Sequence, residues 1–263
     1  MEARGESTAF APPPPGASPV SIWLSAERVP PGPAELVAVV VNRTDEEAFY
    51  GIAGAVDRWD GGAWVPHRVV AMCMDHWHCT SELRPVGEGL EIQDIGLSAS
   101  LGRPGPAERF TTDGLEVGWY RVSQTVDGGT VVSGTFEVTD GVAPPAPLVS
   151  VDAPAISISP VVVSPAGGEV SLYPLIPAPS GNQSADDIHR AVEGLAEVAA
   201  IETWDGERWA QVTEVTLTGQ DPESHDRQRT ADLPALDPGA YRLVRTGPAG
   251  DHAGHFWVAA TRR

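Results

Sequence analysis

The fold is decided by a stretch that occurs twice, VDRWDGGAW at residues 56–64 and IETWDGERW at residues 201–209. In each copy an Asp-Gly pair stands between two Trp residues, and Gly supplies the positive φ angle that a tight hairpin turn requires. We therefore predict a β-hairpin at each place, with the two Trp side chains on paired strands. We interpret the Trp pair as a packing contact, because both copies keep it. The alternative is an exposed aromatic platform for sugars or peptides.

Two further matches follow in the same order along the chain. GWYRV at residues 118–122 returns as GAYRL at 239–243, and GTFEV at 134–138 returns as GHFWV at 254–258. Three ordered matches indicate an internal duplication, and hence two domains built alike.

The domain boundaries follow from the Pro-rich segments. Residues 141–147 are typical of a stiff linker, and residues 1–17 contain four consecutive prolines typical of a poorly ordered leader. We predict a first domain over residues 18–140 and a second over residues 148–263. The chain has 28 Gly and 25 Pro among 263 residues, which indicates frequent turns and short strands.

One segment departs from the strand pattern. Ser184 to Asp187 can cap a short helix whose apolar face would hold Ile188, Val192 and Leu195. The predicted fold is therefore all-β, with two tandem antiparallel β-sandwiches and a short helical insertion in the second.

The Tyr of the second repeated motif points to a known family. Tyr120 and Tyr241 each follow a turn at the start of a strand, as in the tyrosine corner of immunoglobulin-like folds. With the Trp-Asp-Gly-x-x-Trp and Phe-x-Val motifs, the chain resembles the bacterial immunoglobulin-like domains found as tandem modules in envelope and secreted proteins. The resemblance implies a spacer, adhesive or binding role in an extracytoplasmic setting. No signal peptide is recognisable at the start, which favours the cytoplasm, so the sequence leaves the location open.

The charge balance excludes several classes of function. The formal net charge is -19 at pH 7, which opposes binding to nucleic acid or anionic lipid. All 17 basic residues are Arg, so chemistry that needs a catalytic Lys is excluded. No apolar run is long enough for a membrane-spanning helix, and we expect no membrane insertion.

Specific chemistry is concentrated in an insertion of the first domain, at about residues 71–95. It holds four potential ligands within a short span, Cys73, His76, His78 and Cys79. We favour a Cys73–Cys79 disulfide, which needs an oxidising compartment. The alternatives are two free thiols, or a zinc or copper site made by all four residues. On a strand, the two Cys and the two His would face opposite sides, so only a curled loop could gather all four.

The sequence predicts a non-catalytic binding or structural module of a bacterial envelope or secreted assembly, without a cofactor and with a protein or other surface ligand as partner. The alternative is a zinc- or copper-binding protein that uses the Cys73–Cys79 segment, and the third possibility is a metal-dependent enzyme. The two histidines near the C-terminus, His252 and His255, are expected in a solvated hairpin loop.

Overall fold

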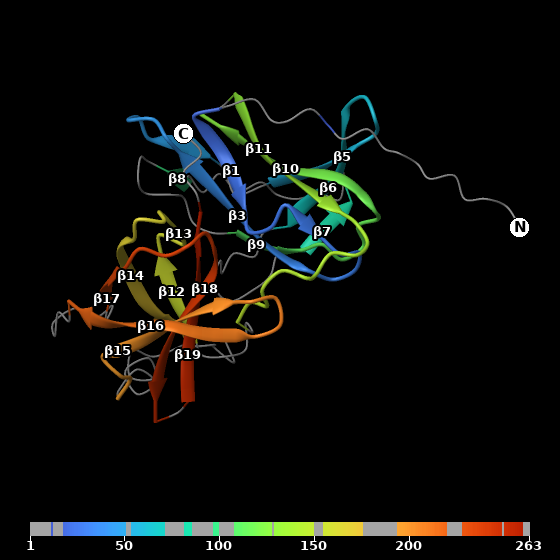
Figure 1. Cartoon of the computed structure of the whole chain (residues 1–263). Helices are drawn as coiled ribbons and strands as arrows, with labels where there is room; N and C mark the ends of the chain where they lie inside the picture. The colour runs from blue at the N-terminus through green and yellow to red at the C-terminus, as the bar shows by residue number, and fades with distance from the viewer. Residues whose placement is uncertain are drawn as a thin grey trace, which may run out of the picture. The chain divides into compact units, whose positions relative to one another are not determined.

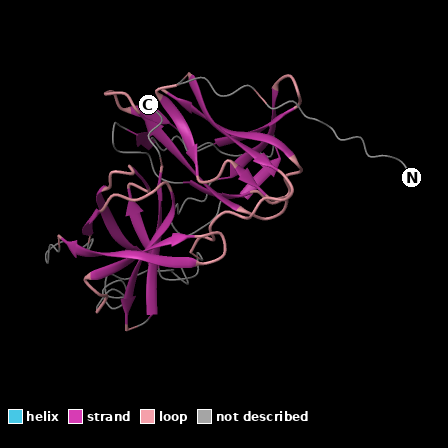
Figure 2. Cartoon of the chain, in the orientation of Figure 1, coloured by secondary structure: helices cyan, strands magenta, loops and turns pink. Residues whose placement is uncertain are grey.

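The structure is a computed structural model, and it describes residues 12, 18–50, 54–71, 82–85, 97–99, 108–127, 129–149, 155–175, 194–219, 228–248 and 250–259. Every regular element among these residues is a β-strand, as Figure 2 shows. The described residues divide into two compact units, one ending at Pro145 and the other starting at Ala146. Within the described part of the chain, no helix is long and apolar enough to span a bilayer.

Unit 1 contains two hydrogen-bonded sheets (Figure 1). One has the order β1-β3-β9. The other has the order β2-β11-β10-β5-β6-β7, with β4 pairing β10 and β8. The strands are β1 (Val20–Leu24), β2 (Arg28–Val29), β3 (Glu35–Asn42), β4 (Ala48–Tyr50), β5 (Gly54–Trp59), β6 (Trp64–Ala71), β7 (Glu82–Pro85), β8 (Leu97–Ala99), β9 (Glu108–Thr111), β10 (Gly118–Val126) and β11 (Thr130–Val138).

Unit 2 has the order β12-β14-β17-β16-β15-β18-β19-β13, and β12 also pairs with β19. Its strands are β12 (Ala155–Ser159), β13 (Val162–Val163), β14 (Gly168–Leu175), β15 (Val198–Trp204), β16 (Trp209–Thr218), β17 (Arg229–Leu233), β18 (Gly239–Gly247) and β19 (Gly250–Val258).

The hydrogen bonding of unit 2 closes on itself, a feature that the predicted antiparallel β-sandwich does not include. The strands from β12 through β14, β17, β16, β15 and β18 to β19 form a ring, because Ala155 of β12 pairs with Ala253 of β19. Strand β16 also contributes to the ring. It pairs with β15, and its last two residues, Leu217 and Thr218, pair with β17. In unit 1 the corresponding strand β6 is shorter and pairs with β7 instead.

The two units use the same strand registers around their centres. Tyr120 pairs with Phe136 in unit 1, and Tyr241 pairs with Phe256 in unit 2. Each Tyr ring stacks on its Phe partner, with centroids 5.6 and 5.5 Å apart. All four side chains are buried, since alternate residues of the strands face the core.

One glycine in each unit lets two strands cross closely. A Cβ on Gly134 would lie 2.7 Å from the backbone oxygen of Ile22, and one on Gly254 would lie 2.3 Å from that of Ile156. Real Cβ atoms do not approach backbone oxygens so closely, so β1 and β12 require glycine at these places.

The helix predicted over residues 184–195 falls mostly outside the described residues. Its last position does not: Gly194 forms a turn and Leu195 has no regular structure, so no helix reaches Leu195. The reason is tertiary, because the Leu195 side chain packs on Gly247 of β18 and is buried there.

A partly buried acidic side chain lies beside the core of unit 1. Glu108 lies on the same face of β9 as the buried Phe110, and its Oε1 atom is buried. Burial raises the pKa of Glu108 to about 8, and burial together with the Glu108 charge raises the pKa of Tyr50. The folded state of unit 1 therefore favours the neutral carboxyl.

Replacing Gly254 with Ala should destabilise unit 2 by about 3 kcal/mol, because the new methyl group meets backbone that cannot move without breaking the β12 pairing. Chemical denaturation followed by Trp fluorescence measures this change. Gly239→Ala is the matched control, since its Cβ would meet only the Tyr241 ring, at 3.6 Å. Equal stability of the two variants would contradict the crossing geometry.

Unit 1 should lose stability as the pH rises from about 4.5 to about 8. The pKa of Glu108 is raised in the folded state, so the folded chain binds more protons than the unfolded chain within this window. Glu108→Gln should flatten the decline and stabilise the unit at pH 8. Asp113→Asn, at an exposed position, should leave the decline unchanged. Urea denaturation at several pH values tests this, and an unchanged slope in Glu108→Gln would refute it.

Candidate functional site: an arginine–tryptophan face on each unit

The predicted hairpins are confirmed, and an aspartate organises each turn. The Oδ1 atom of Asp60 accepts hydrogen bonds from the backbone N–H groups of Gly62 and Ala63, at 2.8 and 2.7 Å. Asp205 accepts the same two bonds from Glu207 and Arg208, both at 2.9 Å. These backbone donors lower the pKa of both aspartates. The φ angles of Gly61 and Gly206 are 102° and 104°, as the turn requires.

The Trp residues that flank each turn form a cross-strand pair. Trp59 is paired with Trp64, with ring centroids 5.2 Å apart and planes tilted by 60°. Trp204 is paired with Trp209, at 5.4 Å and 56°. All four side chains are half-buried. They therefore pack against each other and still present part of each ring to solvent.

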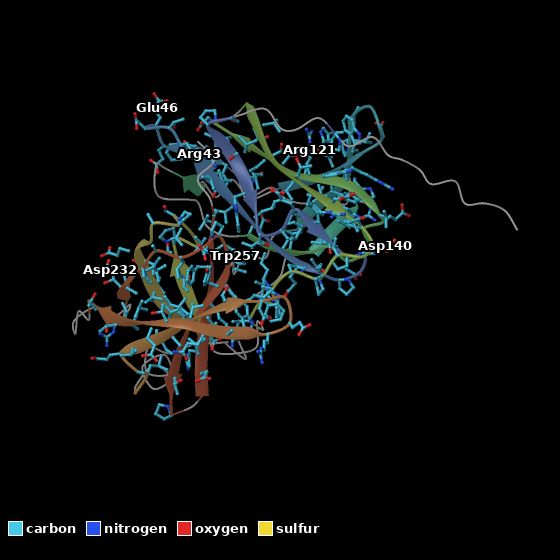
Figure 3. The ribbon with its side chains drawn as sticks, viewed as in Figure 1. Arg43, Glu46, Arg121, Asp140, Asp232 and Trp257 are labelled. Carbon is cyan, nitrogen blue, oxygen red and sulfur yellow. The ribbon has the colours of Figure 1, made fainter. Side chains whose placement is uncertain are left out.

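An arginine from the neighbouring strand covers one Trp ring of each pair. The guanidinium of Arg121, labelled in Figure 3, lies 5.0 Å from the ring centroid of Trp64. The guanidinium of Arg242 lies 4.9 Å from that of Trp209. Both distances are within the range of a cation–π interaction, which contributes on the order of 0.5–1 kcal/mol at exposed sites.

A carboxylate holds each arginine in place. The Nε atom of Arg121 donates to Oδ2 of Asp57 at 2.7 Å, and Nε of Arg242 donates to Oε2 of Glu202 at 2.5 Å. The hydroxyl of Ser123 also donates to Asp57, at 3.4 Å. Each unit thus carries the same series of groups across three strands, namely carboxylate, guanidinium and two indoles. We call this series the arginine–tryptophan face.

The face of unit 2 extends over a fourth strand. His255 pairs with Arg242 across β18 and β19, and its ring lies 5.3 Å from Trp209 and 6.3 Å from Trp257. Trp257, labelled in Figure 3, is buried, and the backbone N–H of Val149 donates to Nδ1 of His255 at 3.4 Å. The β19 side of the face is therefore partly covered by its own chain, and the Trp204–Trp209 side is more open.

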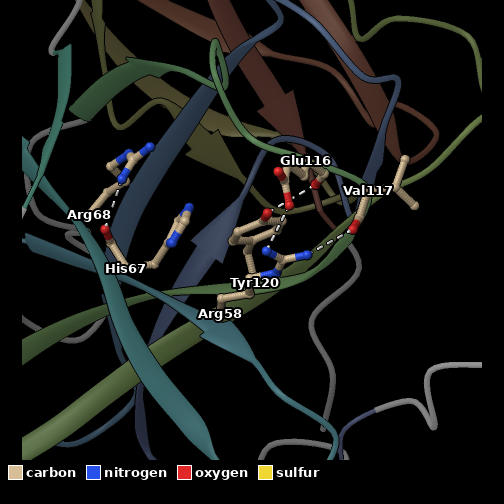
Figure 4. Close-up of polar contacts among 6 residues, drawn as sticks. All are labelled: Arg58, His67, Arg68, Glu116, Val117 and Tyr120. Atoms are coloured by element: carbon tan, nitrogen blue, oxygen red, sulfur yellow. Dashed lines mark hydrogen bonds and ion pairs between the residues drawn. The ribbon is translucent and has the colours of Figure 1, made fainter. Parts of the chain in front are cut away.

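The tyrosine corner predicted from the sequence is present in both units. The Tyr120 hydroxyl donates to the backbone oxygen of Glu116, as Figure 4 shows, and the Tyr241 hydroxyl donates to that of Asp237; both distances are 2.9 Å. These bonds satisfy buried hydroxyl groups and tie the preceding turn to the strand, which is a structural role.

Unit 1 adds a charged cluster beside its corner (Figure 4). Arg58 donates to Glu116 at 2.9 Å, and the His67 ring lies 5.7 Å from the Tyr120 ring. Burial, followed by the charges of Arg68 and Arg58, lowers the pKa of His67. These effects favour the neutral form of the His67 imidazole. The position of His67 could not be predicted from the sequence because it depends on a β-bulge. Val56 pairs with Arg68 and Asp57 with Pro66, which leaves His67 between them.

The residues predicted to form a disulfide or metal site, Cys73, His76, His78 and Cys79, lie outside the described residues. The disulfide and the metal site remain predictions. Among the residues described, no three His, Cys, Asp or Glu side chains are grouped as metal ligands.

The expectation for the C-terminal histidines was wrong. His252 and His255 lie within strand β19 and not in a loop, and His252 is only 1% exposed. The hairpin turn falls earlier, between Gly247 and Gly250, so the strand begins before the Asp251-His252 pair. The sequence shows only two histidines close to a Gly-rich turn. Nothing in it indicates that His252 faces the core.

No protein-family model matches the chain, and no curated protein matches it in sequence. Among solved structures, it is similar to the BSP domain of a biofilm-associated protein (TM-score 0.28, 9% identity, 92% of this chain and 30% of that one). It is also similar to invasin, a bacterial integrin-binding protein (0.24, 10%, 92% and 39%), and to FdeC, an Escherichia coli adhesin (0.25, 15%, 95% and 66%).

The chain spans about a third of the length of the first of these structures. A fish enzyme, the transglutaminase of red sea bream, reaches the same TM-score of 0.28 as the biofilm-associated protein. At TM-scores this low, these likenesses do not indicate the function of the chain.

The state of the Cys73–Cys79 segment can be decided by intact mass. We expect a mass two hydrogens below that of the reduced chain, no reaction with an alkylating reagent, and no bound metal in protein purified without chelator. The sulfur atoms of a disulfide cannot bind a metal as thiolates. The three measurements together therefore distinguish the disulfide from the metal site. Stoichiometric zinc or copper, with thiols that react only after chelation, would instead establish the metal site.

Proposed function

We propose that the chain consists of two copies of one immunoglobulin-like β-sandwich module and works as a non-catalytic binding module. Five features that recur at equivalent registers support the duplication. They are the Asp-anchored hairpin turn, the Trp pair, the Arg stacked on the second Trp, the tyrosine corner and the crossing glycine. Independent domains would not be expected to share all five.

The connections also support an immunoglobulin-like module. In each unit the first strand pairs antiparallel with one sheet, and the short strand after it pairs parallel with the last strand. The hairpin strands β5–β6 and β15–β16 then pack beside the final hairpins β10–β11 and β18–β19. These pairings support the proposed immunoglobulin-like sandwich, in which the first strand is expected to switch between sheets.

We infer the binding role from the arginine–tryptophan face. Half-exposed indoles provide flat apolar surface, and the neighbouring guanidinium and carboxylate provide hydrogen-bonding groups held in fixed positions. Rings with one apolar face and a rim of hydroxyls, as in carbohydrates, match that combination. We therefore propose a carbohydrate chain as the ligand.

Unit 2 is favoured as the binding unit because of Trp204. Its Nε1 atom is buried and has no hydrogen-bond partner among the described residues. An unpaired buried donor costs about 1–3 kcal/mol, so an acceptor oxygen from a ligand would recover this energy after a small shift of the ring. The ring remains half-exposed, which gives such a ligand access to the pair.

The location that we propose with this function is extracytoplasmic. It suits the Cys73–Cys79 disulfide favoured by the sequence, since such bonds persist in oxidising compartments. A binding module of an envelope or secreted assembly would also meet carbohydrate there. The intact-mass measurement above tests the disulfide independently of any ligand.

A glycan array followed by calorimetry with the glycans that bind tests the proposal. Trp204→Phe keeps the aromatic packing and removes the indole N–H, so we expect affinity to fall about tenfold, or ~1.4 kcal/mol. The matched change in unit 1, Trp59→Phe, should leave affinity nearly unchanged. Both variants should unfold within a few degrees of the wild type. Binding to no glycan, or equal affinity of the two variants, would contradict the proposed site.

A further inference from the structure

The outer face of unit 2 is arranged in rows that cross the strands. Glu202 of β15 is paired with Gln211 of β16 on one side and with Arg242 of β18 on the other. Arg242 is in turn paired with His255 of β19. Direct cross-strand partners project on the same side of a sheet, so these four residues form one polar row. The Trp pair of the arginine–tryptophan face occupies the next outward positions of β15 and β16.

Small side chains line the other side of the polar row. Ala200 of β15 is paired with Val244 of β18, and Val244 is paired with Ala253 of β19. All three residues are partly exposed. Their short side chains do not reach across the polar row, so a ligand that lies on the Trp pair can also contact Glu202.

Glu202 is an open hydrogen-bond acceptor within this row. Its Oε2 atom accepts from Nε of Arg242. Its Oε1 atom makes no hydrogen bond among the described residues and is open to solvent, since the side chain is 20% exposed. The Arg109–Glu35 pair of unit 1 differs, because Nε and Nη2 of that arginine engage both carboxylate oxygens. The Arg242–Glu202 pair therefore leaves one oxygen for an external donor.

Unit 1 has a more enclosed carboxylate at the same place. Asp57 corresponds to Glu202, and its side chain is 8% exposed. The hydroxyl of Ser123 donates a second hydrogen bond to Asp57, at 3.4 Å. Val244 stands at the position of Ser123, since each lies three residues after the core Tyr of its unit, and Val has no hydrogen to donate. The open carboxylate is therefore a feature of unit 2.

The charges around Glu202 disfavour an acidic ligand. The charge of Arg242 is already compensated by Glu202. Glu214, which is paired with Ala200 beside the polar row, is a further and exposed acid, and its Oε1 atom accepts from Gln211 at 3.1 Å. The whole chain carries a formal net charge of -19. A carboxylate or sulfate group on a sugar would therefore meet charge of its own sign.

We propose that Glu202 determines the specificity of the arginine–tryptophan face of unit 2, and that it selects sugars with free hydroxyl groups and no acidic group. Its Oε1 atom accepts a hydrogen bond from a ring hydroxyl of a sugar whose apolar side lies on the exposed indole surface. An acidic sugar is rejected because its charge would face Glu202. This specificity concerns the carbohydrate-binding function proposed above and depends on it.

Calorimetry on the full-length chain tests this specificity with two ligands. One is the neutral oligosaccharide that binds most tightly in the glycan array, and the other is the same oligosaccharide oxidised to uronic acid at its primary hydroxyls. At low ionic strength the neutral form should bind about tenfold more tightly, and added salt should reduce the difference by screening the repulsion. Equal affinity of the two forms, or tighter binding of the acidic form, would overturn the proposal.

The array separates this proposal from the broader one. Binding of acidic glycans alone would overturn the specificity assigned to Glu202 and leave the carbohydrate-binding function standing. Binding of no glycan would contradict both.

Glu202→Gln keeps the size of the side chain and removes its charge. The variant should bind the neutral oligosaccharide about fivefold more weakly and bring the affinities of the neutral and acidic forms close together. Glu207→Gln removes the same charge at an exposed position of the hairpin turn, so it is the matched control and should keep the wild-type ratio of affinities. An unchanged ratio in Glu202→Gln would overturn the proposal.

Val244→Ser covers the case in which Glu202→Gln does not fold. It introduces the residue found at position 123 of unit 1 and gives Glu202 a donor from its own chain, so affinity for the neutral oligosaccharide should fall about fivefold. Ala253→Ser adds a hydroxyl to the same small row, two strands away from Glu202, and should leave the affinity unchanged. Equal affinities of Val244→Ser and Ala253→Ser would also overturn the proposal.

Discussion

The stacked Tyr–Phe pair at the centre of each unit fixes the positions on which the other features depend. Because Tyr120 pairs with Phe136, and Tyr241 with Phe256, the final hairpin has one register in each unit, and a slip by one residue would turn every side chain to the other face. The same register sets Arg121 and Arg242 on the outer side, one residue after each Tyr. Core packing and surface chemistry are therefore set by one interaction, and the face cannot shift without disrupting the core.

Local features could be predicted from the sequence, and features that depend on register could not. The Asp-Gly turns and the tyrosine corners were predictable because residues close together in the chain define them. The contact of Arg121 with Asp57 and Trp64 joins three strands. It depends on a β-bulge that cannot be predicted from the residue types. The closure of unit 2 depends on the length of β16 and on a single β12–β19 pair, which strand patterns do not encode.

The two units differ at particular side-chain positions, and these are the positions at which their functions can differ. Positions facing the common core keep their character, as the Tyr, Phe and crossing Gly show. Positions at one end of the core do not: Gln124 stands where unit 2 has Arg245, and Val132 where it has His252. The two units can differ at these positions because the Tyr–Phe pair and the crossing glycine stabilise the fold of each unit elsewhere.

The parallel pairing of the short strands has a mechanical consequence. In each unit a strand near the beginning of the unit, β2 or β13, runs alongside the last strand, β11 or β19, in the same direction. Tension applied through the two ends of a unit would pull these neighbours past each other lengthwise, so several hydrogen bonds must break together instead of one after another. Forced unfolding is governed by the height of the unfolding barrier, and this geometry raises that barrier along the direction of pull. A chain of such units is suited to holding two attachments together under strain.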